Sequence, residues 1–152
     1  EMSASLVGSE MCIRDSYSID DFDAVGALTA ASVPMVSAMI QAAASRGEDL
    51  DGFVMDFVYP SIKGPSIEGR RVVLLDAWLS EKSYVQTSSL VTLRNGNELS
   101  LDFGIVEQLG AKVVAIASLV GGGAKDINVV NPSTGDEQTL PFIQVFDESE
   151  LR

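Results

Sequence analysis

The chain has 152 residues, 46% of them apolar and 21% charged, so it is long and apolar enough to fold as one domain with a core. Twenty-two acidic residues against ten basic ones give a formal net charge of −12, which argues against a general binder of nucleic acid or of an anionic membrane. Histidine is absent and Cys12 is the single cysteine, which excludes Ser-His-Asp catalysis, histidine metal sites and an internal disulfide.

The first sixteen residues differ in character from the rest. Residues 1–16 carry no helical or strand periodicity and no basic or apolar part of a signal peptide. Their end, MCIRDS at positions 11–16, is typical of translated adapter sequence, so we expect a non-native segment, the alternative being a disordered N-terminus. We therefore expect the domain to occupy residues 17–152 and to be incomplete at its N-terminus.

From residue 22 onward, strand and helix patterns alternate. Phe22–Val25 predicts a buried strand, and Gly26–Ser32 predicts a turn of small residues whose last member is suited to cap a helix. The apolar spacing beyond this turn predicts a helix that ends at Gly47. Gly52–Tyr59 then predicts a second strand, and Pro60–Gly69 predicts a loop because it holds two prolines and two glycines.

The middle of the chain combines a central strand with a hairpin. Arg71–Leu75 is an apolar run that predicts a strand buried on both faces and ended by Asp76. The Asn-Gly pair inside Tyr84–Leu101 predicts a β-hairpin. Asp102 is suited to cap a following helix, which Gly110 closes.

The last third predicts strands only. Val113–Val120 predicts another central strand, Ile127–Val130 and Glu137–Leu140 are expected to pair across a turn, and Phe142–Phe146 predicts a final strand. The order of elements predicts an α/β fold with a mainly parallel central sheet, helices on both faces and an inserted β-hairpin.

Four segments carry a resemblance to a known family. Residues 22–34 (FDAVGALTAASVP) match a D-A-V-G-G-L-T-L-G-A-x-P pattern, and residues 67–76 (IEGRRVVLLD) match the strand that leads into a phosphoribosyl pyrophosphate motif. Residues 109–120 and 141–151 match the strands that follow. In this order they resemble the orotate phosphoribosyltransferases. The resemblance implies a type I phosphoribosyltransferase fold, and transfer of ribose-phosphate from phosphoribosyl pyrophosphate to a nucleobase such as orotate, with Mg²⁺, in pyrimidine nucleotide biosynthesis.

The resemblance also implies roles for particular residues. It makes Asp76 the catalytic carboxylate, one of an acidic pair that holds the ribose hydroxyls, although Ala77 stands where the second acid is expected. It places the phosphosugar and its pyrophosphate against two segments: the first turn, with Gly26, Ala27, Leu28 and Thr29, and the phosphate loop, with Ser80, Lys82 and Ser83. Lys63 would be a remnant of the family's basic loop.

Three departures from the family pattern shape the functional expectation. The acidic pair is incomplete, Glu81 or Lys82 replaces the glycine of the phosphate loop, and the basic loop lacks its arginine and histidine. We therefore expect a phosphoribosyltransferase-like protein with a degraded site and weak or absent activity. Two alternatives stay open: an active orotate or related phosphoribosyltransferase that uses Mg²⁺, and a non-catalytic binding or assembly module. We expect a cytoplasmic protein, a homodimer as in the family, and no nucleic-acid or membrane partner.

Overall fold

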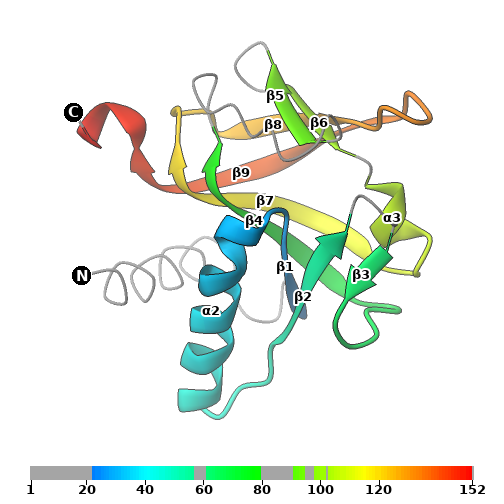
Figure 1. Ribbon diagram of the computed structural model, residues 1–152, viewed down its shortest axis with the longest axis vertical. Coiled ribbons are helices and arrows are strands. Elements are labelled where there is room, and N and C mark those ends of the chain that lie inside the picture. The colour runs from blue at the N-terminus through cyan, green and yellow to red at the C-terminus, as the bar shows by residue number, and fades with distance from the viewer. Residues whose placement is uncertain (1–21, 57–60, 80–90, 95–97, 102, 152) are drawn as a thin grey trace.

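The computed structural model describes residues 22–56, 61–79, 91–94, 98–101 and 103–151. Within these ranges nine strands form one sheet in the order β3-β2-β1-β4-β7-β9-β8-β6-β5 (Figure 1). The strands are β1 (Ala24–Ala27), β2 (Asp51–Asp56), β3 (Ser61–Lys63), β4 (Arg71–Leu79), β5 (Val91–Arg94), β6 (Glu98–Leu101), β7 (Lys112–Gly121), β8 (Asp126–Val130) and β9 (Glu137–Asp147). The helical segments are η2 (Ala30–Ser32), α2 (Val33–Ser45), α3 (Gly104–Glu107) and η3 (Glu148–Leu151).

The predicted fold class is confirmed. The pairs β1–β2, β1–β4, β4–β7, β7–β9 and β6–β8 are parallel, whereas β2–β3, β5–β6 and β8–β9 are antiparallel. The predicted hairpin is present as β5–β6, and β6 joins the sheet through β8. The expected segment 1–16, the hairpin turn 95–97 and the cap Asp102 lie outside the described residues.

Helix α2 covers one face of the sheet. Apolar residues recur at helical spacing on one side of α2, and Met35, Val36 and Met39 on this side are buried. They pack against small and branched side chains of β1, β4 and β7. Gly47, with φ of 73°, follows the helix as predicted. Ser32 stands at the N-cap, but its hydroxyl donates to the Thr29 carbonyl at 2.9 Å and makes no cap hydrogen bond to the helix.

The opposite face is covered by α3 and the C-terminal strands. Phe103, Ile105 and Val106 around α3 join one apolar cluster with Leu74 of β4 and Ile116 of β7. Strands β6, β8 and β9 complete this cluster with Leu99, Leu101, Ile127, Val129, Leu140 and Phe142. Helices therefore cover both faces, as predicted, although α3 is shorter than expected because turns replace its last residues before Gly110. No helix in these ranges is long and apolar enough to cross a membrane.

Three predicted boundaries on the N-terminal side were wrong. The first strand is shifted by two residues, so that Gly26 and Ala27, expected in a turn, pair in register with both β2 and β4. The expected loop contains the edge strand β3, whose three residues are too few to show an alternating pattern. Strand β4 does not end at Asp76 but continues to Leu79, because β7 offers backbone partners as far as Gly121.

The two expected C-terminal strands are one long strand. Strand β9 pairs with β8 through Pro141 and with β7 from Phe142 onward, so it changes partner where proline has no N–H to donate. The predicted pairing of Ile127–Val130 with Glu137–Leu140 is confirmed.

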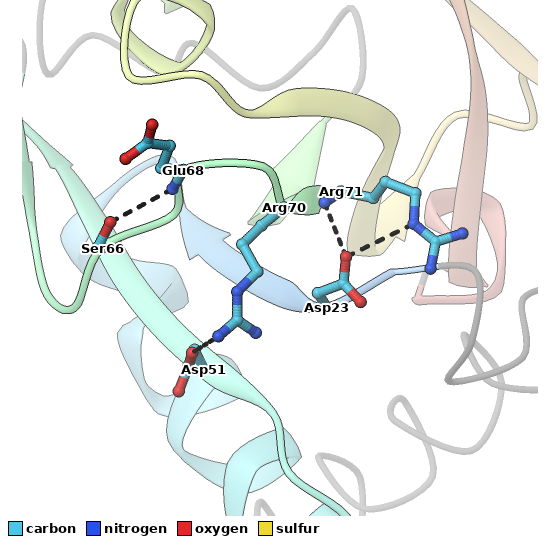
Figure 2. A network of polar contacts seen from close by, with 6 residues as sticks. All are labelled: Asp23, Asp51, Ser66, Glu68, Arg70 and Arg71. Atoms are coloured by element: carbon cyan, nitrogen blue, oxygen red, sulfur yellow. Dashed lines mark hydrogen bonds and ion pairs between the residues drawn. The ribbon is translucent and has the colours of Figure 1, made fainter.

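Ion pairs and a hydrogen bond between charged residues connect the N-terminal ends of three parallel strands (Figure 2). The Arg71 amide donates to Asp23 Oδ2 at 3.0 Å, and the Arg71 guanidinium lies 3.5 Å from the same oxygen. Arg70 pairs with Asp51 at 3.2 Å. The backbone hydrogen bond from Arg71 lowers the pKa of Asp23 below its usual value. These pairs connect the starts of β1, β2 and β4 at the end of the sheet opposite to the site described next.

Gly26 is required for packing, so Gly26→Ala is expected to lower the free energy of unfolding by about 1–3 kcal/mol through overpacking. A Cβ at this position would lie 2.3 Å from the Phe53 ring. Urea denaturation measures the loss, and Phe53→Leu in the same chain is expected to recover part of it. Gly135→Ala is the control, because its cost arises from a φ of 80° with no atom within 4 Å of the added carbon. Equal rescue of both variants by Phe53→Leu would contradict the packing argument.

Candidate functional site

The connections of the chain diverge between β1 and β4. From β1 the chain passes through α2 to β2 on one side, while β4 lies on the other side. In open parallel sheets, ligand sites lie beyond the carboxyl ends of the strands at such a switch point. The carboxyl end of β1 leads to Leu28 and Thr29, and Asp76 lies beside them in β4. The candidate site is therefore at this end of the sheet.

Thr29 and Asp76 form the centre of the site. The Leu28 amide donates to the Leu75 carbonyl at 2.9 Å, which carries the β1 pairing one residue into the turn. The Thr29 hydroxyl then donates to Asp76 Oδ1 at 2.9 Å, and the Ala77 amide donates to the same oxygen at 2.7 Å. Asp76 is only 2% exposed and Thr29 only 7%. The two residues that the resemblance assigned to separate roles thus bind each other.

The second carboxylate oxygen of Asp76 has no hydrogen-bond partner, although it is buried. Burial raises the pKa of Asp76 above its usual value, and the hydrogen bonds from Thr29 and Ala77 oppose this rise only in part. Asp76 is therefore easier to protonate than an exposed aspartate, and its side chain is almost entirely shielded from solvent.

A row of polar residues crosses three strands at the level of Asp76. Asp76 is in register with Ser118 of β7, and Ser118 with Gln144 of β9. The Ser118 hydroxyl donates to the Val120 carbonyl, and Gln144 Oε1 accepts from the Gly123 amide at 2.8 Å. The apolar row Leu74, Ile116 and Phe142 lies two residues earlier in these strands, on the same face of the sheet. Sequence analysis missed Ser118 and Gln144, because only strand pairing shows that they are neighbours of Asp76.

The first-turn residues have structural contacts of their own. Gly26 and Ala27 are buried in β1 between β2 and β4, and Leu28 is buried in the core. Thr29 makes a second hydrogen bond, in which its backbone amide donates to Ser32 Oγ at 3.4 Å. Of the four residues expected to contact pyrophosphate, Thr29 is the one whose side chain reaches the switch point.

Among the described residues, acidic side chains of η3 and of the end of β9 lie near the carboxyl end of β4. Trp78 is 41% exposed, and its indole N–H donates to Glu148 Oε2 at 3.4 Å. Asp147 accepts from the Ser149 amide and hydroxyl, which lowers the pKa of Asp147, and its own amide donates to Glu150. The expected phosphate-binding residues Ser80, Lys82 and Ser83 lie outside the described residues. The neighbouring groups that the structure does describe carry negative charge, which repels phosphate.

Lys63 lies on the edge strand β3, away from Thr29 and Asp76 in the sheet order. Its ammonium group is 3.8 Å from Asp56 Oδ2 at the end of β2, and its side chain is 68% exposed. The expected basic residue is thus paired with an acid, at a position that gains little energy from the pair.

The family implies Mg²⁺, which prefers oxygen ligands and is held by one or two carboxylates together with substrate phosphates. Among the residues that the structure describes, no three Asp, Glu, His or Cys side chains gather as a metal site would require. At the switch point the single carboxylate is buried and one of its oxygens already accepts two hydrogen bonds. These residues do not by themselves build a magnesium site.

Comparison with known proteins identifies the family of the chain. No protein-family model matches the chain. The chain is 31% identical over 155 residues to the orotate phosphoribosyltransferase of Streptomyces avermitilis, a match that covers 98% of this chain and 74% of that protein. It is 30% identical, with the same coverage, to the orotate phosphoribosyltransferase of Streptomyces coelicolor. The chain belongs to the orotate phosphoribosyltransferase family.

Solved structures agree on the fold. The orotate phosphoribosyltransferase of Mycobacterium tuberculosis in complex with phosphoribosyl pyrophosphate has a TM-score of 0.63 at 22% identity, covering 100% of this chain and 78% of that one. A phosphoribosyltransferase from Corynebacterium diphtheriae has a TM-score of 0.62 at 19% identity, covering 97% of this chain and 77% of that one. The type I phosphoribosyltransferase fold expected from the sequence is thus confirmed.

The Thr29–Asp76 hydrogen bond is expected to stabilise the fold. Thr29→Val removes the donor from a buried carboxyl, so we expect a loss of about 1–2 kcal/mol in the free energy of unfolding, measured by urea denaturation. Thr29→Ser keeps the hydroxyl and is the matched control, expected within about 0.5 kcal/mol of the wild type. Equal stability of the two variants would show that the hydrogen bond contributes nothing.

Proposed function

We propose that this phosphoribosyltransferase-like chain has a degraded phosphoribosyl pyrophosphate site and transfers ribose-phosphate weakly or not at all. The observation that carries the proposal is the state of Asp76. Its carboxyl group is 2% exposed, accepts two hydrogen bonds from its own protein on Oδ1, and has a raised pKa because it is buried. A carboxylate that holds ribose hydroxyls has to present charged oxygens to the ligand.

The neighbouring residue removes the second carboxylate. Ala77 follows Asp76, so the chain offers one acid where the family pattern has two. An oxocarbenium-like centre is stabilised by negative charge close to it, and an alanine at position 77 supplies none. The chemistry at the anomeric carbon would therefore lack part of its electrostatic support.

The path of β4 also supports the proposal. Residues Trp78 and Leu79 pair with Val120 and Gly121 of β7, so the chain remains in the sheet for three residues after Asp76. Phosphate cradles are built from loops with free amides at a helix N-terminus. The acidic residues of η3 beside Trp78 add repulsion toward a ligand with several negative charges.

A second candidate is an active orotate or related phosphoribosyltransferase. It is favoured by the retained switch point, and by two curated relatives described as orotate phosphoribosyltransferases at 31% and 30% identity. In that case Mg²⁺ would arrive bound to the phosphosugar, and a homodimer would be the working form. The third candidate is a non-catalytic binding or assembly module. Like the main proposal, it predicts that the protein shows no turnover.

We expect no orotate-dependent release of pyrophosphate above background, and no micromolar binding of phosphoribosyl pyrophosphate with Mg²⁺ in calorimetry, because Asp76 is buried and its partner acid is missing. The Streptomyces avermitilis relative, assayed in parallel, is the positive control, and a cooperative thermal transition of this chain shows that the assayed protein is folded. Turnover comparable to that of the relative would reject the proposal in favour of the second candidate. Tight binding without turnover would indicate a ligand-binding module instead.

A further inference from the structure

We propose that a pocket near the starts of the parallel strands binds a small zwitterion, namely a free α-amino acid with an aliphatic side chain. The pocket lies between the C-terminal end of α2 and the start of β2, at the end of the sheet opposite to Thr29 and Asp76. This inference goes beyond the proposed function, because it involves no phosphosugar and no residue of the switch point.

The pocket is an open depression with a volume of about 320 Å³. Pockets for small molecules hold roughly 300–1,000 Å³, so this one suits a ligand at the small end of that range. Three aliphatic and four charged residues line it, and the charges have both signs. A ligand that fits therefore has to combine a short hydrocarbon part with charged groups.

The aliphatic part of the lining comes from α2 and from the residue that leads into β2. Ile40 and Ala44 stand four residues apart on α2, so they are neighbours on the same side of the helix. Leu50 directly precedes β2 and is buried. These three side chains offer a surface for a short branched hydrocarbon chain, which gains energy when it leaves water.

Arg70 supplies the positive charge of the pocket. It stands directly before β4 and reaches toward the start of β2, where its Nη2 lies 3.2 Å from Asp51 Oδ2 (Figure 2). Its side chain is 44% exposed, and among the described residues Asp51 is the partner of its guanidinium group. A guanidinium group has five N–H donors, so Arg70 can hold Asp51 and a ligand carboxylate at the same time.

The negative charge comes from the connection between α2 and β2. Three carboxylates line the pocket, but two of them already have a cationic partner: Glu48 lies 3.7 Å from Arg46 Nε, and Asp51 pairs with Arg70. Asp49 is exposed and has no partner within the part of the chain that the structure describes. The pocket thus offers one unpaired carboxylate and part of one guanidinium group, which match the ammonium and carboxylate groups of an α-amino acid.

Other small ligands match the pocket less well. An anion without an ammonium group would meet three carboxylates, and a simple amine would face the positive charge of Arg70 and leave its remaining donors unused. A neutral hydrocarbon would have to displace water from the charged groups without replacing its hydrogen bonds. A zwitterion pairs with both charges while its side chain covers the aliphatic surface.

The first experiment titrates the full chain with three probes that share one carbon skeleton, followed through the amide signals in NMR. L-Leucine carries both charges, isoamylamine lacks the carboxylate and isocaproate lacks the ammonium group. We expect saturable shifts around residues 48–51 and 70 with L-leucine, and binding weaker by about tenfold or more for each of the other two, because each loses one charged contact. Equally tight binding of isoamylamine or isocaproate, or no saturable shift with L-leucine, would overturn the proposal.

The second experiment tests the two charged contacts with variants of the full chain. Asp49→Asn and Arg70→Gln are each expected to weaken the binding of L-leucine by about tenfold or more. Arg71→Gln is the matched control and is expected to bind as the wild type does, because Arg71 stands next to Arg70 but pairs with Asp23 and does not line the pocket.

A cooperative thermal transition shows that each variant is folded. Asp49→Asn changes an exposed side chain, so the test stays decisive even where Arg70→Gln fails to fold. Unchanged binding of L-leucine by Asp49→Asn, or an equal loss of binding in Arg71→Gln, would overturn the proposal.

Discussion

The burial of one carboxyl group where the chain connections diverge is the constraint on which the rest of the site depends. Asp76 stands in β4 with β7 on one side and the turn after β1 on the other, and it is tolerated there because Thr29 and Ala77 donate to it. Burial among these elements raises the pKa of the carboxyl. A change in this packing would alter the fold and the chemistry of the site together.

The distribution of charge distinguishes the two ends of the sheet. At the strand starts, Arg70 and Arg71 are paired with Asp51 and Asp23 (Figure 2). At the carboxyl ends, the described charged groups nearest to Trp78 are acidic and belong to η3 and the end of β9. An anion site at the carboxyl ends needs the opposite arrangement. The chain belongs to the orotate phosphoribosyltransferase family, and the acidic groups near Trp78 support the proposal of a degraded site.

Much of the fold was predictable from local patterns, and the misses share one physical origin. Apolar runs identified β4 and β7, the Asn-Gly pair identified the β5–β6 hairpin, and the spacing before Gly47 identified α2. The continuation of β4 past Asp76 was missed because an aspartate usually ends an apolar strand, whereas here β7 supplies backbone partners as far as Gly121. The edge strand β3 and the fusion of two strands into β9 were missed because they depend on their neighbours for pairing.

The amino-acid sequence by itself determined the fold class, the resemblance to the family and the loss of the second acid at Ala77, since each follows from the identity and order of nearby residues. It also named Asp76 and Thr29 as candidates, but as separate ligand contacts. Only the tertiary structure decided that they bind each other, that Ser118 and Gln144 extend the polar row across the sheet, and that Gly26 serves packing against Phe53. The physical reason is that strand pairing joins residues far apart in the chain, and burial, which sets the charge state of a carboxyl, exists only once these strands are assembled.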